Sequence, residues 1–320
     1  MLDRYQLEAF AAVVEHQSFE RAASVLTVTR GAISQRIKSL EEALSTVLVN
    51  RVRPIAPTAA GEIVLRHVKA IRLLEHDVYR LIAPKLTDHD RAPVAIAVNA
   101  DSLATWFGPS SQLMLKRLPV ALEVLVEDQD HTWPMLARGD VVGCISTESR
   151  PSQGFDSLRL GAMEYRCVAS PAFAATYFPD GLQLRQAIAA PAIVFNRKDL
   201  LHDRFLEALF GVRIERYAKH YFPSPVALLE AILADNGYGL VPSGQVGALL
   251  EAGTLVDLAP SHPVHVSLYW HHWQHEPEVA RTVTEFVVEV AKRLLLQEAQ
   301  GDGAASAPAS PRDNRQGAAV

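Results

Sequence analysis

Basic, amide and hydroxyl side chains recur at helical spacing in the first sixty residues, and together they could read DNA. The spacing predicts a helix that begins after Thr29. Its exposed face carries Arg30, Ser34, Gln35, Lys38 and Glu41, with Arg36 at its edge. Arginine can pair with guanine and glutamine with adenine in the major groove. Lysine and serine more often hold the phosphate backbone. The chemistry that this face predicts is hydrogen bonding to base edges and phosphates.

Two short helices joined by a tight turn must position this face. Ser18 is a good N-cap residue for the first helix, and Thr29 for the second. Val28 would fill the gap between the two helices at the turn. The inward stripe of the second helix is Ala32, Ile33, Ile37, Leu40 and Leu44. We therefore expect a helix-turn-helix, completed by a preceding helix over residues 5–16, and count Ser18 and Thr29 among its DNA-binding residues.

A small wing is predicted to follow. Residues 47–53 indicate a strand that Pro54 and Pro57 close, with Arg51 and Arg53 beside the flanking phosphates. The formal net charge of the whole chain is −5, and acidic residues also offset the basic ones in this segment. The prediction of DNA binding therefore depends on local placement and not on a globally basic domain.

A long amphipathic helix, capped by Thr58 and reaching to about Pro84, is the next expected element. Its narrow apolar seam predicts pairing between two chains, although packing on its own domain is the alternative. Residues 85–92 are polar and flanked by proline, which is typical of a hinge. We expect a DNA-binding domain over residues 1–58 and a linker or dimerisation helix with hinge over residues 59–90.

Short β-rich runs alternate with helical ones from residue 93 onward, which predicts an α/β fold. Strands are expected over 94–98, 121–126, 141–145, 166–169, 192–195, 239–242 and 264–270. The pattern resembles a two-lobed, periplasmic-binding-protein-like effector domain over residues 91–300. Lobe I would comprise about 91–163 and 263–300, lobe II about 164–262, and the cleft between them would hold a small molecule.

Composition indicates the class of protein and the state of its cysteines and its C-terminal residues. The chain has 320 residues, with no long apolar run and no basic-then-apolar leader, so we expect a soluble, cytoplasmic protein. Its two cysteines, Cys144 and Cys167, are expected to be reduced and buried. The Gly-, Ala-, Ser- and Pro-rich residues 301–320 predict a disordered tail.

Polar residues that follow predicted strands are the candidates for the cleft. Backbone N–H groups at a helix start near Asp101 and the hydroxyl of Ser102 could bind a carboxylate, and Glu127 and Asp128 place acidic groups near the same rim. Such a pair of features would suit a zwitterion with an extra positive charge. Asn196, Asp199 and Ser224 are further candidates. Simple helix capping and solvated loops remain the alternatives for these residues.

Two other patterns predict no chemistry. Neighbouring histidines among residues 271–275 would point to opposite faces of a strand, so we expect no metal site. The glycines of residues 236–240 lack the strand and helix that surround a dinucleotide-binding loop. No catalytic triad can be assembled from local signals, and we expect neither an enzyme nor a cofactor.

The chain resembles the LysR-type transcriptional regulators. The resemblance is carried by Phe19-Glu-Arg-Ala-Ala23, Ile33-Ser-Gln-Arg-Ile-Lys-Ser-Leu-Glu41, Arg51 and Pro57-Thr-Ala-Ala-Gly61. It implies a winged helix-turn-helix, a linker helix that makes the dimer, and an effector domain. Double-stranded promoter DNA, a homodimer or homotetramer, and RNA polymerase are the implied partners. Two positions depart from the family pattern: Arg30 stands where glutamine is frequent, and Ser45 where glycine is common.

Within that family, residues 98–107, 126–128, 138–143 and 268–271 look like the ArgP/LysG branch. The resemblance implies a sensor of L-lysine or L-arginine that controls a promoter such as that of an amino-acid exporter. A ligand-insensitive architectural or replication-origin DNA-binding protein is the alternative.

Overall fold

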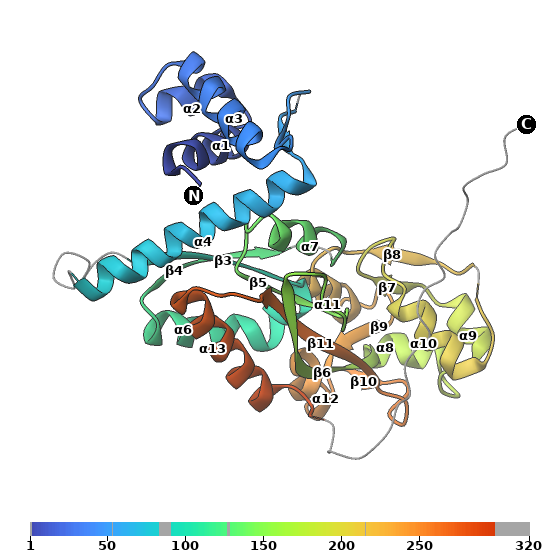
Figure 1. Ribbon diagram of the computed structural model, residues 1–320. Helices are drawn as coiled ribbons and strands as arrows, with labels where there is room; N and C mark the ends of the chain where they lie inside the picture. The colour runs from blue at the N-terminus through green and yellow to red at the C-terminus, as the bar shows by residue number, and fades with distance from the viewer. Residues whose placement is uncertain (1, 53, 83–90, 127–128, 215, 298–320) are drawn as a thin grey trace, which may run out of the picture.

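The computed structural model describes residues 2–52, 54–82, 91–126, 129–214 and 216–297. Figure 1 shows a small helical unit at the N-terminus, one long helix beneath it, and a larger body of helices and strands below that helix. The expected tail over residues 301–320 and most of the expected hinge lie outside the described residues. No described helix is both long enough and apolar enough to cross a membrane.

Three helices form the N-terminal unit: α1 (Arg4–His16), α2 (Phe19–Val25) and α3 (Arg30–Leu44). The capping predictions for Ser18 and Thr29 are confirmed, because their hydroxyls accept hydrogen bonds from Arg21 N and Ala32 N, both at 3.2 Å. Phe10, Ile33 and Leu40 are fully buried where the three helices meet. The predicted helix-turn-helix is present.

The wing is shorter than the sequence indicates. Only β1 (Val49–Asn50) and β2 (Ala56–Pro57) pair, in antiparallel register. The strand predicted over residues 47–53 is present only at Val49–Asn50, after which the side chain of Asn50 accepts a hydrogen bond from Val52 N at 3.1 Å. That bond turns the chain back on itself before a longer ladder can form.

The long helix α4 (Ala59–Ile82) joins the two parts of the molecule. The hydroxyl of Thr58 accepts a hydrogen bond from Gly61 N at 3.1 Å and donates one to Val47 O at 2.7 Å, which fastens the helix start to the wing. Leu65 is buried in the core of the N-terminal unit, whereas Leu73 is buried in the core of the larger body. One helix therefore contributes to both cores.

A mixed sheet organises the larger body, and the predicted α/β fold is confirmed. Its strand order is β10-β6-β11-β5-β3-β4, with β9 also paired to β6. The strands are β3 (Ala92–Val98), β4 (Val120–Val126), β5 (Gly143–Ser146), β6 (Phe155–Ala169), β9 (Gly239–Pro242), β10 (Val256–Asp257) and β11 (Val264–Trp273). β3 pairs in parallel with β4 and β5, and β11 runs antiparallel to β5 and β6.

The long strand β6 links two lobes. Its residues up to Tyr165 pair with β11 in the first lobe, and its last residues pair with β9 and β10 in the second. The strand predicted over residues 166–169 is present, but these residues are the end of a strand of 15 residues that begins in the first lobe. The second lobe also holds a parallel pair, β7 (Ala192–Val194) and β8 (Lys219–Tyr221).

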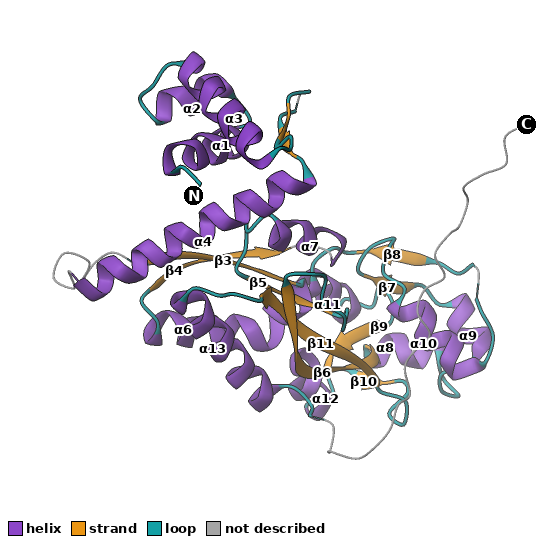
Figure 2. Ribbon diagram, in the orientation of Figure 1, coloured by secondary structure: helices purple, strands orange, loops and turns teal. Residues whose placement is uncertain are grey.

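Helices flank the strands in both lobes (Figure 2). In the first lobe they are α5 (Ala100–Ser102), the π-helical turn η1 (Leu103–Phe107), α6 (Gly108–Arg117), α7 (Gln129–Ala137) and α13 (Glu278–Leu294). In the second they are α8 (Pro171–Tyr177), α9 (Leu184–Ala189), α10 (Leu201–Phe210), α11 (Pro225–Leu233) and α12 (Ser243–Glu251). The α5, η1 and α6 segments form one continuous helical run directly after β3, and α10 begins shortly after β7.

Candidate functional site

The outer face of α3 presents polar side chains to solvent. Gln35 and Lys38 are exposed, and Arg30 lies at the first position of the helix. Arg30 pairs with Glu20 at 3.2 Å and Lys38 with Glu42 at 3.7 Å, and both pairs are well exposed. Exposed ion pairs contribute little free energy, about 0–1 kcal/mol, so phosphate groups can replace these carboxylates at small cost.

Smaller contacts complete this face. Gln35 Nε2 lies 3.5 Å from the hydroxyl of Ser39 one turn along, and Ser34 is half-buried. The guanidinium of Arg36 lies over the ring of Tyr5 on α1, 5.4 Å from its centroid. Arg36 therefore sits at the side of the face nearest α1, which matches its expected place at the edge.

The structure corrects the expected exposure of Glu41. Its carboxylate accepts hydrogen bonds from Leu48 N at 2.9 Å and Val49 N at 3.3 Å, and it pairs with Arg51 at 3.5 Å. Glu41 holds the start of the wing against α3 and is not part of the open face. Arg51 is exposed beside it, while Arg53 lies outside the described residues.

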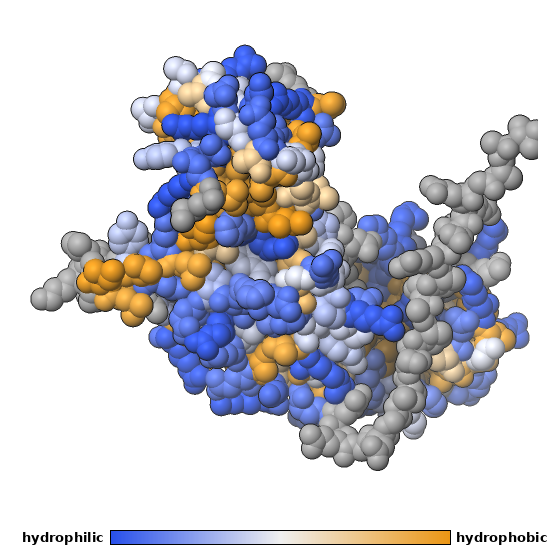
Figure 3. All heavy atoms as spheres, viewed as in Figure 1, coloured by the Kyte–Doolittle hydropathy of each residue, from blue (hydrophilic) through white to orange (hydrophobic). Residues whose placement is uncertain are grey.

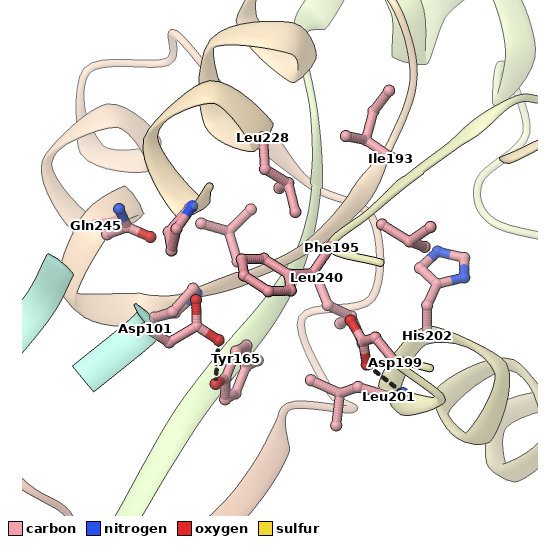
Figure 4. A pocket seen from close by; sticks show the side chains of 14 residues that line it. Asp101, Tyr165, Ile193, Phe195, Asp199, Leu201, His202, Leu228, Leu240 and Gln245 are labelled. Carbon is pink, nitrogen blue, oxygen red and sulfur yellow. Dashed lines mark hydrogen bonds between the residues drawn. The ribbon is translucent and has the colours of Figure 1, made fainter. Parts of the chain in front are cut away.

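A second candidate site is the cavity between the two lobes (Figure 4). Its empty volume is about 390 Å³, part of it open to solvent. The described residues that line it are Asp101, Tyr165, Ile193, Val194, Phe195, Asp199, Leu201, His202, Pro225, Leu228, Leu240, Val241, Pro242 and Gln245. This set contains two carboxylates and neither lysine nor arginine.

Asp101 enters the cavity from the first lobe. The hydroxyl of Tyr165 on β6 donates a hydrogen bond to Asp101 Oδ2 at 2.7 Å (Figure 4). Burial raises the pKa of Asp101; the Tyr165 hydrogen bond opposes this rise and the nearby Asp199 adds to it. Removal from water disfavours the charged carboxylate, and a cation placed beside it would favour that charged form.

Asp199 enters the same cavity from the second lobe, after β7. It accepts a hydrogen bond from Leu201 N at 2.8 Å at the start of α10. Burial raises the pKa of Asp199, and its backbone hydrogen bonds oppose that rise. Asn196 serves the loop, because its side-chain oxygen accepts from Lys198 N at 2.8 Å and Asp199 N at 3.0 Å.

The other predicted ligand contacts lie outside the cavity lining or outside the described residues. Ser102 is fully buried and its hydroxyl has no partner among the described residues, but it does not line the cavity. Ser224 caps α11 through Ala227 N at 3.4 Å, one residue before the lining residue Pro225. Glu127 and Asp128 lie outside the described residues.

Sequence reasoning missed several lining residues, above all Tyr165, His202 and Gln245. Phe195 could have been found, because it is the last residue of a predicted strand, at an edge where ligands bind. Tyr165 lies inside a strand, and nothing local to it indicates that its hydroxyl meets an aspartate 64 residues away. In the part of the chain that the structure describes, no three His, Cys, Asp or Glu side chains converge as metal ligands.

Both parts of the chain match known protein families. Residues 5–62 match the model described as the bacterial regulatory helix-turn-helix protein of the lysR family, and residues 87–292 match the LysR substrate binding domain. The HTH-type transcriptional regulator ArgP of Pseudomonas fluorescens strain Pf0-1 is 41% identical over 298 residues, which cover 92% of this chain and 99% of that protein.

Solved structures are similar along the same length. The crystal structure of ArgP from Mycobacterium tuberculosis has a TM-score of 0.85 at 36% identity, covering 93% of this chain and 100% of that one. Full-length LysG from Corynebacterium glutamicum with the effector Arg bound has a TM-score of 0.79 at 31% identity, covering 92% and 99%. The similarity therefore includes the helix-turn-helix, the long helix and both lobes together.

Proposed function

Because this chain belongs to the LysR family of bacterial helix-turn-helix regulators, we propose that it is a transcription regulator that senses L-lysine or L-arginine in the cleft between its lobes. The family comprises DNA-binding regulators with an effector-binding domain, not enzymes. Its members are oligomers that bind DNA through the helix-turn-helix. What this protein binds in its cleft, and which promoter it controls, are the parts proposed here.

The observation that carries the proposal is a cavity with two half-buried carboxylates from opposite lobes and no lining lysine or arginine among the described residues. A cationic amino acid would add a positive charge beside Asp101 and Asp199, of which only Asp199 is already influenced by a lysine, Lys219. Phe195 and Leu228 line the same cavity and could pack on its methylene groups. The bound arginine of the LysG relative supports this choice of ligand.

The carboxylate end of the ligand needs hydrogen-bond donors. Gln245 lines the cavity and carries an amide that can donate. The helix start after β3 is the contact that we predicted from the sequence; Ser102 ends α5 and does not line the cavity, so we retain only the backbone N–H groups of this helix start in the proposal. Asn196 and Ser224 would act indirectly, by holding Asp199 and the start of α11 in place.

Ligand binding would act on DNA through a population shift. The amino acid contacts both lobes, so it stabilises the arrangement in which the lobes are closest around it. We propose that this changes how two copies of the chain hold their recognition helices. The bending of DNA near a promoter, such as that of an amino-acid exporter, would change as a result. RNA polymerase would be the partner at that promoter, in the cytoplasm.

The far end of α4 supports pairing between copies of the chain. Leu74, Val78, Leu81 and Ile82 are each at least half exposed on this helix. Figure 3 shows apolar side chains gathered over that end of the molecule. We propose that this strip forms a homodimer contact, from which a homotetramer can be built, so that two recognition helices read an interrupted palindrome.

Thermal unfolding of the purified protein with each of the twenty amino acids tests the proposal. A ligand at one hundred times its dissociation constant stabilises the folded state by about 2.7 kcal/mol. Stabilisation by lysine or arginine alone, followed by an altered footprint on promoter DNA, is the expected result. Stabilisation by an unrelated amino acid would remove the basic ligand from the proposal, and no stabilisation would favour a ligand-insensitive architectural or origin-binding protein.

A further inference from the structure

His202 occupies an unusual position in the wall of the cavity. It lies in the first turn of α10, is 2% exposed, and lines the cavity together with Asp199 (Figure 4). Its ring contacts the edge of Tyr238, with the ring centroids 5.0 Å apart. Burial lowers the pKa of His202 to about 4, so the imidazole is neutral at physiological pH and carries one proton.

The neighbours of His202 decide which ring nitrogen holds that proton. Nδ1 lies 2.8 Å from the hydroxyl oxygen of Tyr217, and that hydroxyl donates its only proton to Asp203 Oδ1 at 2.5 Å. The oxygen of Tyr217 must therefore accept from the ring, which places the proton of His202 on Nδ1. The Tyr217 contact thus fixes the tautomer.

Lys219 keeps Asp203 in its ionised form. Lys219 Nζ donates to both carboxylate oxygens of Asp203, at 2.6 and 2.8 Å. Burial would raise the pKa of Asp203, but the hydrogen bonds from Lys219 and Tyr217 outweigh burial and lower it. Asp203 remains an ionised acceptor, so the hydroxyl of Tyr217 donates to Asp203 and not to His202.

The other ring nitrogen, Nε2, is then an acceptor with nothing to accept from. It is buried and has no hydrogen-bond partner among the described residues. A buried polar atom without a partner is unfavourable, and in an otherwise well-bonded cluster such an atom calls for an explanation. His202 lines the cavity, but Nε2 itself has almost no exposed surface, so a donor from the cavity reaches it only when the wall shifts on binding.

We propose that His202 Nε2 accepts a hydrogen bond from a nitrogen of the bound basic amino acid, and that this makes His202 a specificity-determining residue of the cleft. This inference rests on the proposed function. Asp101, Asp199 and His202 then form a set of acceptors around the ligand's cationic end. A guanidinium offers five N–H donors and an ammonium three, whereas a carboxylate offers none. Tyr217, Asp203 and Lys219 act as positioning residues.

The first test uses two substitutions that separate the ring nitrogens. In His202→Asn the amide can replace Nδ1 and donate to Tyr217, but nothing replaces Nε2. In His202→Gln the longer amide can place an acceptor near Nε2. Calorimetric titration with L-arginine should show binding roughly tenfold or more weaker in the asparagine variant, with partial recovery in the glutamine variant. Circular dichroism checks that each variant is folded.

The second test observes the nitrogen directly in the wild-type protein. The chain has 12 histidines, so the His202 signals are assigned as those missing from the spectrum of His202→Asn after ¹⁵N-histidine labelling. Without ligand, Nδ1 should be protonated and Nε2 bare, and L-arginine should shift the Nε2 resonance toward that of a hydrogen-bonded acceptor. Tyr217→Phe should release the tautomer preference.

The outcomes separate this inference from the proposed function. A protonated Nε2 in the free protein overturns the inference whatever the protein binds. Wild-type binding of arginine with an unmoved Nε2 signal, and equal affinity in His202→Asn, overturns it while the sensor function stands. Failure of the wild-type protein to bind any basic amino acid removes both, and a shifted Nε2 signal with weakened variants supports both.

Discussion

Asp101 and Asp199 are ionisable groups placed where their charge is poorly stabilised. Burial raises the pKa of each carboxyl, and Asp199 raises that of Asp101 further. A ligand cation would lower both pKa values again. The same residues that would bind the ligand therefore weaken the ligand-free fold, which is a frequent property of functional sites.

Replacing Asp101 by asparagine should stabilise the free protein and weaken ligand binding. Because the folded-state pKa of Asp101 is raised, stability is lost as pH rises through that pKa, and the variant avoids this loss. The excess stability of Asp101→Asn should be present at neutral pH and disappear in acid. Removing one partner of a buried charge pair costs about 2–5 kcal/mol, so arginine should bind at least about 30-fold more weakly.

Thermal unfolding across pH and calorimetric titration measure these two effects. In the wild-type protein, affinity for arginine should fall as pH drops through the raised pKa of Asp101, since protonation removes the charge that holds the cation. The hydrogen bond from Tyr165 can be kept by the asparagine oxygen, so the variant should remain folded. A variant that is less stable at neutral pH, or that binds arginine normally, would contradict the assignment of Asp101.

Gln35 and Lys38 offer a matched pair on the outer face of α3, because both are exposed there. Gln35→Ala should cost about 1–3 kcal/mol on the preferred operator and relax base preference, if Gln35 pairs with a base edge. Lys38→Ala should weaken binding to every sequence and lower the salt slope by about one, as expected for a phosphate contact. Binding titrations over a salt series distinguish these roles, and identical behaviour of the two variants would refute them.

At the scale of elements, the junction of α4 with the wing has no spare room. A Cβ atom on Gly61 would lie 2.1 Å from the carbonyl oxygen of Leu48, and backbone cannot move aside as a flexible side chain can. Gly61 also donates its N–H to Thr58, so the first turn of α4 is fixed on the wing from two directions. This close approach gives a physical reason for glycine at the end of Pro57-Thr-Ala-Ala-Gly61.

Gly61→Ala should therefore destabilise the N-terminal unit by about 1–3 kcal/mol, as overpacking does, and weaken DNA binding. Arginine binding in the cleft should not change. Gly247→Ala is the control, because a Cβ there meets nothing within 4 Å on helix α12, and alanine should stabilise by about 0.4–1 kcal/mol. Denaturant unfolding and DNA titration of both variants check this, and equal effects of the two substitutions would rule out the steric explanation.

At the scale of the whole molecule, α4 is bound to both of its neighbours. Arg72 pairs with Glu8 at 2.6 Å and Glu15 at 2.7 Å on α1. On the other side, Lys69 pairs with Asp140 of the first lobe at 2.6 Å, and Arg66 donates to Ala137 O at 2.8 Å. A change at the cleft can reach the DNA-binding unit through this helix, because both units contact it directly.

Asp140→Asn should weaken the hold of the first lobe on α4 without touching the cavity. We expect arginine affinity within about twofold of wild type, and a reduced effect of arginine on DNA affinity, since mutations between coupled sites change coupling by about 0.5–2 kcal/mol. Glu285→Gln is the control, because its pair with Arg281 is exposed on α13 at 4.0 Å. DNA titrations with and without arginine measure the coupling, and an unchanged coupling in Asp140→Asn would exclude this contact from signal transfer.

The sequence by itself determined the DNA-reading end. The caps Ser18 and Thr29, the inward stripe of α3 and the start of α4 all depend on contacts within a few residues of one another, and periodicity and capping rules report such contacts. It also predicted most strands, a small-molecule cleft, and Asp101 and Asp199 beside it. It did not find that Glu41 holds the wing, because that depends on where residues 48 and 49 return to α3.

Only the tertiary structure decided which side chains meet in the cleft. Tyr165 reaches Asp101 because β6 runs on from the first lobe into the second, where the sequence suggested a break. The tautomer of His202 depends on Tyr217, Asp203 and Lys219, which α10 and β8 bring together. These contacts arise from strand pairing and helix packing between distant segments. The hydrophobic periodicity of one segment does not indicate which distant segments pack against it.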